Sequence, residues 1–386
     1  MIFTLEAQSG GARAATIEIA TDHSGAKSGE TYIQTPVFMP VGTAGAVKSL
    51  DAIDLNTILK PQIILANTYH LYLRPGAAAI KEAGGLRRWT RFGGLFLTDS
   101  GGFQAFSLRG AKVTDEGVKF RSHIDGSPHF FTPRGAIEAQ QAFGSDIMMT
   151  LDDLPALPAK PRRIKESIER TTRWARESLE FHNRSLENGA NANANLFAIA
   201  QGGVDRNFRE ISAGELTTIS ANGKTFDGFA IGGLSVGEEN AQMYETIDFT
   251  APLLPAEKPR YLMGVGAPEN LVEAVDRGVD MFDCVMPTRN ARNGTLFTRR
   301  GAIHIRRAEF DNCERPVEEG CECYACQNFS IGYIRHLYKA NEITYYRLAS
   351  LHNLHYYLEL TRRMRSAILA DRWAEFKREF YADRGK

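Results

Sequence analysis

Short apolar runs recur along the chain, and each run ends in or beside Gly, Asn, Asp or Gln. Eight such runs are present, at residues 37–42, 63–67, 95–99, 147–152, 196–201, 229–233, 261–264 and 281–283. Runs of four to six apolar residues without alternation are typical of parallel strands buried on both faces. The clearest amphipathic helices are expected between them, at residues 134–143, 162–187, 207–221 and 268–277. Eight strand and helix units in about 250 residues predict an α/β fold, a (β/α)8 TIM-type barrel.

Both ends of the chain carry additional patterns. Residues 2–32 alternate apolar and polar positions around Gly10, Gly11 and the glycine-rich stretch 25–29, which predicts an N-terminal β-hairpin that caps the bottom of the barrel. From about residue 345 to 384 we expect a helical stretch. Its inward side chains would be Leu348, Leu351, Leu358, Ile368 and Leu369, and its outward side chains Arg362, Arg363, Arg365, Lys377 and Arg378.

Polar residues stand where the predicted strands end. They are Asn67, Asp99, Asp152, Gln201, Gly233 and Asp283. In a (β/α)8 barrel the reactive groups lie at the C-terminal ends of the strands, so these residues should face one mouth. A single Asp there can simply cap the next turn, and βα loops are polar in any barrel. Three Asp together with an Asn and a Gln are hard to explain as caps alone.

Paired carboxylates at one mouth suit the chemistry of glycosidic bonds. One carboxylate can attack the anomeric carbon while the other moves protons at the leaving group. An Asp with a Gln and backbone amides beside a glycine can instead read the Watson–Crick edge of a purine. Together they describe a nucleoside whose N-glycosidic bond is the target. Arg289 and Arg292, just after Asp283, would hold the flanking phosphates.

Overall charge does not indicate a partner, because the 386 residues include 46 basic and 46 acidic side chains. From Met286 onward, however, 18 Lys and Arg stand against 12 Asp and Glu, which is compatible with a basic face near the C-terminus. No apolar run approaches the ~18–20 residues that span a membrane. The N-terminal residues lack the features of a signal peptide. We therefore expect a cytoplasmic protein without a membrane partner.

Three of the five cysteines lie in the segment Cys321-x-Cys323-x-x-Cys326, which is too tight for a disulfide scaffold and better suited to a metal than to free buried thiols. Candidates for a fourth ligand are His336, His352, His355 and, more weakly, Cys313. His352 is preferred because it would stand at the start of the last long helix, although His355 lies almost one turn further on. Four protein ligands leave no open position, so we expect one structural Zn²⁺ per chain.

Several motifs together identify a family. They are NTYHL at 67–71, LTDSGGFQ at 97–104, GGLSVGE at 232–238, YLMGVG at 261–266, DMFDCVMPTR at 280–289, and the cysteine segment with His352-Asn353. With these motifs the chain resembles the bacterial tRNA-guanine transglycosylases, also called queuine tRNA-ribosyltransferases, along essentially its whole length. The resemblance implies a zinc-containing (β/α)8 pentosyltransferase of queuosine biosynthesis. Such an enzyme replaces the wobble guanine in the anticodon loop of tRNAs for Asp, Asn, His and Tyr with 7-aminomethyl-7-deazaguanine.

The resemblance also implies roles for individual residues. Asp283 would be the nucleophile and Asp99 the general acid and base. The substrate-binding residues would be Ser100, Gly101, Gly102, Phe103, Asp152, Gln201, Gly233 and Tyr261. Of these, Asp152, Gln201 and Gly233 would read the base, and Phe103 and Tyr261 would stack on it. The RNA-contacting residues would be Gly264, Val265, Gly266, Ala267, Pro268, Glu269, Asn270, Thr288, Arg289, Asn290, Ala291 and Arg292, and the zinc ligands Cys321, Cys323, Cys326 and His352.

Two positions depart from the family pattern. Leu154 stands where many relatives have a Cys, which makes the pocket wall more apolar, and Phe103 replaces a Tyr found in some relatives. Val236 is the residue associated with the bacterial substrate rather than bulkier queuine. The resemblance further suggests a homodimer and a single catalytic domain, 1–386, with a zinc-binding subdomain at 290–352 before the last helix.

Three alternatives fit parts of these observations. A non-catalytic RNA-binding homologue of the same fold should lack one of the two aspartates, and both Asp99 and Asp283 are present. A retaining glycosidase gives no role to Asp152 and Gln201 as purine readers. A zinc hydrolase with this fold would need metal ligands at strand ends, whereas the cysteine cluster lies outside the repeat.

Overall fold

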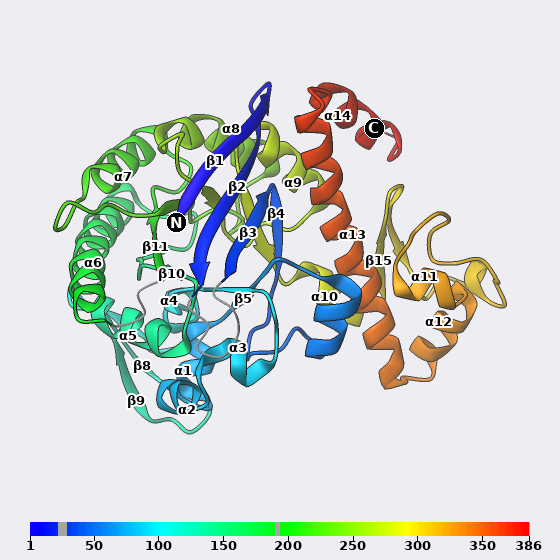
Figure 1. The fold of residues 1–386 in the computed structure, drawn as a ribbon, viewed down its shortest axis with the longest axis horizontal. Coiled ribbons are helices and arrows are strands. Elements are labelled where there is room, and N and C mark those ends of the chain that lie inside the picture. Colours follow the sequence, from blue (N-terminus) through cyan, green and yellow to red (C-terminus); the bar gives the residue numbers. More distant parts are fainter. Residues whose placement is uncertain (22–28, 190–193, 386) are drawn as a thin grey trace.

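The structure is a computed structural model that describes residues 1–21, 29–189 and 194–385. Eight parallel strands form a barrel at its centre (Figure 1). In spatial order they are β4 (Val37–Pro40), β14 (Met281–Cys284), β13 (Arg260–Leu262), β12 (Gly228–Ile231), β11 (Asn195–Ala200), β10 (Ile147–Met149), β6 (Leu95–Thr98) and β5 (Ile63–Ala66). A parallel bridge between Val41 and Leu65 joins the two ends of this order, so the sheet closes. Each strand overlaps one predicted apolar run, and the barrel is confirmed.

Successive residues of each strand point alternately into the barrel and toward the surrounding helices. On β6, Leu97 belongs to the cluster that fills the barrel, whereas Phe96 belongs to the cluster beneath the helices. Counting on by two from Leu97 places Asp99 on the inner side of the mouth. The same count places Gln201 after β11 and Asp283 within β14 on the inner side.

Helices on the outside of the barrel connect the strands. They are the short π-helix η1 (Asp54–Leu59), α1 (Thr68–Leu73), α2 (Ala77–Glu82), α3 (Gly85–Thr90), α4 (Gly102–Ser107), α5 (Pro133–Phe143), α6 (Pro161–Glu187), α7 (Arg206–Thr218), α8 (Asn240–Thr250), the 3-10 turn η2 (Ala251–Leu253) and α9 (Pro268–Asp276). The four predicted helices correspond to α5, α6, α7 and α9. Helix α5 shows the expected end signals, because Thr132 caps its start and Gly144 ends it with φ 69°.

The N-terminal residues form an antiparallel sheet of β1 (Ile2–Ser9), β2 (Ala12–Thr21) and β3 (Gly29–Thr35). Ile17, Ile19 and Ile33 join the cluster inside the barrel, so this sheet closes the N-terminal end of the barrel. A buried ion pair of 2.7 Å between Arg13 and Asp280 fastens it beside the start of β14. The predicted cap is confirmed, with a third strand added. The turn predicted at residues 25–29 lies outside the described residues, apart from its last residue.

The chain leaves the barrel after β14 and returns to it through a long helix (Figure 1). The elements of this excursion are α10 (Met286–Arg292), β15 (Thr295–Thr298), β16 (Gly301–His304), η3 (Ala308–Phe310), α11 (Tyr324–Asn328) and α12 (Ile331–Lys339). Most of them pack around a core of their own. Helix α13 (Ile343–Leu369) then lies against β4, where it takes the place of the eighth outer helix.

Three expectations for the C-terminal segment were wrong. The helical stretch is interrupted, because α13 ends at Leu369 and α14 (Trp373–Ala382) follows after Asp371, which has φ 53°. Leu369, expected inside, is 47% exposed. Arg365, expected in solvent, is buried and donates to the carbonyls of Ala15 and Thr35, each at 2.9 Å. Helical periodicity could not show that the N-terminal sheet covers this side of α13.

The apolar pattern also missed an excursion between β6 and β10. After α4 the chain forms a small antiparallel sheet of β7 (Lys112–Val113), β8 (Val118–Arg121) and β9 (Pro128–Phe131). Its buried side chains Val118, Phe120 and Phe131 pack with Tyr69 of α1 and Ala105 of α4. The small sheet therefore rests on the two helices that follow the ends of β5 and β6. Among the described helices, none combines the length and apolarity needed to cross a membrane.

Candidate active site

Asp99 directly follows β6, and its carboxylate accepts hydrogen bonds from the start of α1 and from Gly101, the residue before α4. Oδ1 accepts hydrogen bonds from the backbone N of Thr68 (2.8 Å) and of Gly101 (3.2 Å). Oδ2 accepts from the side-chain amide of Asn67. Asn67 is also the N-cap of α1, where its Oδ1 accepts from the backbone N of His70 at 3.0 Å. One asparagine therefore ties the position of Asp99 to the start of a helix.

Asp283 lies within β14, and two donors hold one of its carboxylate oxygens. The hydroxyl of Tyr261 donates to Oδ1 at 2.5 Å, and the backbone N of Gly264 donates to the same atom at 2.8 Å. Both bonds go to Oδ1, and neither involves Oδ2. Burial raises the pKa of Asp283, and both hydrogen bonds limit the rise because they stabilise the ionised form.

The carboxyl group of Asp99 lies in the electrostatic field of Asp283. Burial raises the pKa of Asp99 to about 7, and the negative charge of Asp283 contributes to the rise. Burial also raises the pKa of Tyr261, and the charges of both aspartates add to that effect. Together with the strand alternation, the effect of Asp283 on Asp99 and of both charges on Tyr261 indicates that the two carboxyl groups face one mouth. A carboxyl group with a pKa near 7 can accept and release protons at neutral pH.

A second pair of polar side chains stands beside this mouth. Asp152 follows β10 and Gln201 follows β11, and Nε2 of Gln201 donates to Oδ2 of Asp152 at 2.6 Å. Ser100 donates to the other oxygen of Asp152 at 3.5 Å. Oε1 of Gln201 is buried, and no hydrogen-bond partner reaches it from the part of the chain that the structure describes. A buried acceptor without a donor is costly, so a bound ligand with an N–H group would be favoured there.

Gly233 completes this wall of the site. Its φ is 69°, and a Cβ built there would lie 2.6 Å from Oε1 of Gln201 and 3.3 Å from Cδ1 of Leu154. Only glycine leaves this space open. Leu154, the residue that departs from the family's cysteine, therefore lies next to the expected base-reading group. Burial raises the pKa of the neighbouring Asp152 to about 7, and the hydrogen bond from Gln201 partly offsets this rise because it stabilises the ionised form.

The residues expected to stack on a base differ in accessibility. Phe103 lies in the first turn of α4 and is 56% exposed, so its ring is available. Tyr261 has no exposed surface, and in this conformation it offers Asp283 its hydroxyl rather than offering a ligand its ring face. Ser100 and Gly102, which precede Phe103 in the chain, are buried, and the backbone N of Gly102 donates to Oγ of Ser100 at 3.2 Å.

Arg209 belongs to this region and was missed by sequence reasoning. It is fully buried on α7, and burial lowers its pKa to about 9. Its guanidinium donates to three backbone carbonyls at the ends of β11 and β12, those of Ala200 (2.9 Å), Gly203 (2.8 Å) and Gly232 (2.7 Å). The arginine thus fixes the two loops that carry Gln201 and Gly233. In the sequence it looks like any polar residue of an amphipathic helix.

The two segments expected to contact RNA are only partly accessible. In the first, Gly264 is exposed, Ala267 and Glu269 are partly exposed, and Val265, Gly266, Pro268 and Asn270 are buried. The hydroxyl of Tyr244 donates to Oδ1 of Asn270 at 2.6 Å, and that of Tyr357 donates to the carbonyl of Gly266. The buried members therefore shape the loop and offer little surface to a partner in this conformation.

The second segment is α10, which begins three residues after Asp283. Thr288 and Ala291 are buried, Asn290 and Arg292 are partly exposed, and Arg289 is exposed. Burial lowers the pKa of Arg292, and the positive charge of Arg289 lowers it further. One terminal nitrogen of Arg292 is buried, and no hydrogen-bond partner lies near it among the described residues. Two neighbouring guanidinium groups, one of which has a donor without a partner among those residues, are suited to bind an anion such as a phosphate.

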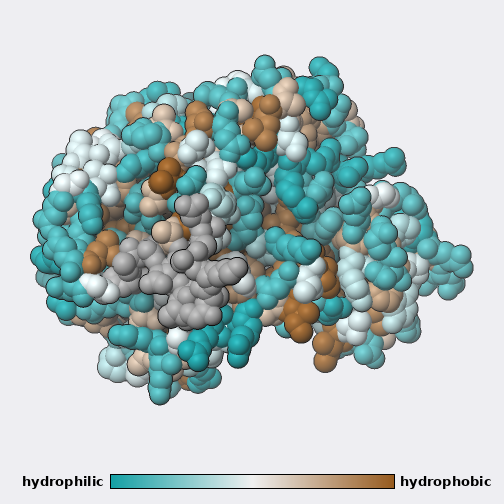
Figure 2. All heavy atoms as spheres, viewed as in Figure 1, coloured by the Kyte–Doolittle hydropathy of each residue, from teal (hydrophilic) through white to brown (hydrophobic). Residues whose placement is uncertain are grey.

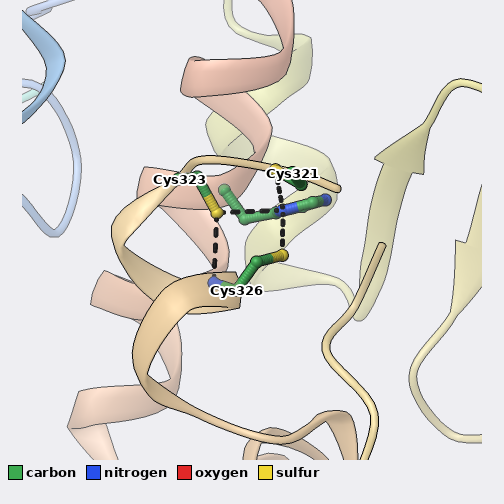
Figure 3. Close-up of side chains that lie close together, drawn as sticks. Cys321, Cys323 and Cys326 are labelled. Carbon is green, nitrogen blue, oxygen red and sulfur yellow. Dashed lines mark hydrogen bonds between the residues drawn. The ribbon is translucent and has the colours of Figure 1, made fainter. Parts of the chain in front are cut away.

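The structure brings His352 to the three clustered cysteines (Figure 3). The ligand atoms of Cys321, Cys323, Cys326 and His352 all lie within 4.8 Å of one another, and all four residues are buried. Nδ1 of His352 is 3.4 Å from the sulfur of Cys323 and 3.5 Å from that of Cys326. Within the described ranges, His336, His355 and Cys313 are not part of this group. His352 lies in the third turn of α13, not at the start of the helix as expected.

The surroundings of this group favour metal binding. Nε2 of His352 lies 2.7 Å from the carbonyl oxygen of Phe297, and this bond turns Nδ1 toward the sulfurs. The backbone N of Cys326 lies 3.3 Å from the sulfur of Cys323 and donates to it. Three thiols and one oriented imidazole form a set that could hold a metal ion.

Two comparisons relate the chain to known proteins. A family model described as "Queuine tRNA-ribosyltransferase" matches residues 8–386. A curated protein of Helicobacter hepaticus (strain ATCC 51449 / 3B1), named "Queuine tRNA-ribosyltransferase", is 56% identical over 383 residues. The matched region covers 99% of this chain and 97% of that protein. Both likenesses include the barrel mouth and the buried group of three cysteines and a histidine.

Proposed function

The chain belongs to the queuine tRNA-ribosyltransferase family and is a tRNA-guanine transglycosylase, and from this premise we propose its substrates and its mechanism. It exchanges the guanine at the wobble position of the tRNAs for Asp, Asn, His and Tyr for 7-aminomethyl-7-deazaguanine, as a step of queuosine biosynthesis. The proposal is supported by the placement of Asp99 and Asp283 at the C-terminal ends of β6 and β14, by the effect of the Asp283 charge on Asp99, and by the hydrogen bond between Gln201 and Asp152 at the ends of β11 and β10.

The first step breaks the bond between guanine and ribose. The wobble nucleotide is unstacked and enters the mouth, which a single-stranded loop permits at modest cost. The carboxylate of Asp283 attacks C1′ of the ribose as the C1′–N9 bond breaks. The electron pair of that bond stays on N9, which takes a proton from Asp99. The pKa of about 7 at Asp99 supports this role, because the group carries a proton in much of the enzyme at neutral pH.

The second step forms the new bond. The ester between Asp283 and C1′ keeps the tRNA attached while guanine leaves and the deazaguanine enters the vacated space. The new base gives its N9 proton to the carboxylate of Asp99 and attacks C1′, and the ester bond breaks to restore Asp283. Two displacements give net retention at C1′. One N-glycosidic bond replaces another, so the exchange needs neither ATP nor a redox cofactor.

The base is read by Asp152, Gln201 and Gly233. Support comes from the unpaired Oε1 of Gln201 and from the space that Gly233 leaves beside it. The hydrogen bond between Gln201 and Asp152 gives way to bonds with the edge of the purine when the base binds. Phe103 covers the base with its exposed ring, Ser100, Gly101 and Gly102 line the pocket, and Tyr261 acts through its hydroxyl on Asp283. Val236 adjusts the preference toward the smaller bacterial base.

The RNA on either side of the wobble nucleotide lies along residues 264–270 and 288–292. Arg289 and Arg292 hold flanking phosphates, which the proximity of their two charges and the unused donor of Arg292 support. Gly264 provides exposed backbone at the edge of the mouth. The buried members of both segments set the shape of these loops.

The metal is one Zn²⁺ per chain, held by Cys321, Cys323, Cys326 and His352. Three thiolates and one imidazole from four buried residues match a closed tetrahedral site. When bound, the ion cross-links the cysteine loop to α13 and has no role in bond exchange. The chain is one catalytic domain, 1–386, with residues 290–352 as its zinc-binding subdomain.

The enzyme acts as a homodimer. Two apolar side chains support an interface near the start of α13, because Ile343 is 83% exposed and Ile53 is 68% exposed. An ion pair of 2.5 Å between Arg347 and Asp54 keeps the two segments together. On the face shown in Figure 2, apolar side chains gather beside the lower end of α13. A single patch of this kind fits a self-complementary contact between two copies.

The exchange can be tested with tRNA and radiolabelled guanine in the absence of ATP. The enzyme should transfer label into tRNAs that have guanine at the wobble position. A tRNA with another base at that position serves as the control and should stay unlabelled. Labelling of neither, by folded protein, would contradict the proposed substrates. Release of sugar from oligosaccharides without labelling of tRNA would favour a glycosidase instead.

A further inference from the structure

A groove on the small sheet carries basic and aromatic side chains that the proposed reaction does not use. It is lined by Arg109, Lys112, Lys119, Arg121, His129 and Phe130, and we call it the β7–β9 groove. The four Lys and Arg side chains and Phe130 are exposed. The alternation along β8 explains this face, because Val118 and Phe120 point into the core while Lys119 and Arg121 point outward.

The arrangement of charge in the groove is unfavourable for a surface that faces only water. Lys112 of β7 and Lys119 of β8 are direct cross-strand partners, and like charges opposite each other destabilise a sheet. Among the ion pairs of the described residues, none includes the four basic side chains of the groove. Glu116 is an acidic neighbour, because the charge of Lys119 acts on it, but Glu116 does not line the groove. A bound polyanion would relieve this repulsion.

An aromatic side chain lies among these cations. Phe130 of β9 is the next cross-strand partner of Lys119, whose ammonium lies 5.1 Å from the centre of the ring. Phe130 is 42% exposed. Basic side chains that track a backbone, together with an exposed ring on which a base can stack, are the usual equipment for single-stranded nucleic acid. The row Lys112, Lys119 and Phe130 across three strands offers both.

The groove lies close to the catalytic mouth. Helix α4 starts three residues after Asp99 and spans six residues, which is about 9 Å. Arg109 follows the end of α4, so the groove begins where α4 ends. The small sheet also touches α1, the helix that holds Asp99: the hydroxyl of Tyr69 lies 2.6 Å from Nδ1 of His123, and that of Tyr72 lies 3.2 Å from Nδ1 of His129. Figure 1 shows β8 and β9 beside α1 and α5.

We propose that the β7–β9 groove binds the sugar-phosphate backbone of the substrate tRNA outside the base pocket. This inference rests on the proposed function, because it assumes that the wobble base occupies the neighbouring mouth. The groove supplies affinity for the RNA and leaves the exchange of bases to the mouth. Its residues read no sequence, since Lys and Arg at phosphates position a nucleic acid without identifying its bases.

The test compares two triple variants in the label-exchange assay. The first is Lys112→Ala, Lys119→Ala and Arg121→Ala. The matched control is Lys60→Ala, Arg184→Ala and Lys224→Ala, three exposed cations that precede β5, β11 and β12 at the other end of the barrel. The groove variant should raise KM for tRNA about 10-fold or more and leave kcat and the KM for guanine unchanged. A plot of log KM for tRNA against the logarithm of the salt concentration should also have a slope that is smaller by about 2 in the groove variant. Each lost phosphate contact removes about 0.7 to 0.9 from this slope.

The outcomes separate this inference from the proposed function. If the wild-type enzyme labels no tRNA, the proposed function fails. If the wild type labels tRNA and the groove variant keeps the wild-type KM and salt slope, the groove proposal is overturned while the function stands. A lower kcat or a higher KM for guanine in the groove variant would place the effect at the mouth and also overturn it. Phe130→Ala adds an independent check, with an expected rise in KM for tRNA of about 5-fold or more from a lost stacking contact.

Discussion

The hydroxyl of Tyr261 donates a hydrogen bond of 2.5 Å to Oδ1 of Asp283 from a side chain with no exposed surface. The backbone N of Gly264 binds the same oxygen. Both donors favour the ionised carboxylate, and both leave Oδ2 free to approach a ribose carbon. Tyr261 is therefore a positioning residue for the nucleophile, a role that the family resemblance did not assign to it.

Replacing Tyr261 with Phe tests this role while keeping the buried ring. The lost bond should raise the pKa of Asp283 further, because that bond lowers it in the wild type. Attack requires the ionised form, so the acid limb of the profile of kcat against pH should move to higher pH. At a pH well above this limb, kcat should still fall about 10-fold, which corresponds to about 1.4 kcal/mol. If Tyr261→Phe had the wild-type kcat and the wild-type midpoint of the acid limb, the hydroxyl of Tyr261 would be dispensable.

Asp152 should make stability depend on pH. Its pKa is raised from 3.8 to about 7 by burial, so between these values the folded state binds more protons than the unfolded state. Stability then falls as pH rises from about 4 to about 7. Asp152→Asn removes this loss. The variant should gain on the order of 2 kcal/mol over the wild type at pH 8 and almost nothing at pH 4.5, as measured by urea unfolding.

The neighbouring Asp153 provides the matched control for that experiment. It is also buried, but it forms ion pairs with Arg163 and Arg170. Asp153→Asn should therefore destabilise the protein at both pH values, because it removes the buried carboxylate that Arg163 and Arg170 share. If Asp152→Asn gained the same stability at pH 4.5 and pH 8, the pKa of Asp152 would be the same in the folded and the unfolded protein. That result would contradict the expectation.

Replacing Arg209 should loosen the wall that reads the base. Arg209→Met removes the side-chain donor of the carbonyls of Gly203 and Gly232, and one of the two donors of the Ala200 carbonyl, which keeps the backbone N of Gly232. The cost is about 1–3 kcal/mol for an unsatisfied buried group. We expect this loss in urea unfolding and a KM for guanine that rises more than the KM for tRNA. Arg206→Met, at the exposed start of the same helix, is the control and should change neither quantity. A wild-type KM for guanine in Arg209→Met would show that Arg209 does not position the residues that read the base.

The metal site predicts different results for two cysteines in the same excursion. Cys323→Ser should release zinc and unfold the C-terminal subdomain, because three ligands cannot close the site. Cys313→Ser should keep one zinc per chain, since Cys313 lies outside the buried group. Elemental analysis of the two purified variants decides the matter. Unchanged zinc in Cys323→Ser would mean that the ion, if any, binds elsewhere.

The barrel could be predicted from sequence because its signals are local. Strands buried on both faces produce unbroken apolar runs, and the residues that end them lie at one mouth whatever the loops do. Asp99 and Asp283 could be placed at that mouth for this reason. The cysteine spacing indicated a metal group with His352 as the preferred fourth ligand, and the structure confirms that His352 joins the three cysteines. Its expected position at the start of α13 was wrong, and the carbonyl of Phe297 that orients it could not be predicted from the spacing.

The parts that could not be predicted depend on contacts between distant segments. Arg209 and Arg365 look like solvent-facing residues of amphipathic helices, yet each is buried because backbone carbonyls elsewhere in the chain accept its hydrogen bonds. The small β7–β9 sheet was missed because its strands are two to four residues long, too short for a periodic pattern. The hydroxyl of Tyr261 found its partner through the pairing of β13 with β14, which no local signal encodes.

The central claim is that Asp283 forms a bond to the ribose of the wobble nucleotide. It is tested most directly by mixing the enzyme with tRNA, quenching in denaturant, and asking by gel and mass spectrometry whether a covalent adduct forms and on which peptide. The wild type should give an adduct on the peptide that contains Asp283, and Asp283→Asn should give none while binding tRNA with nearly unchanged affinity. An adduct that persists in Asp283→Asn, or that maps to another residue, would contradict the account.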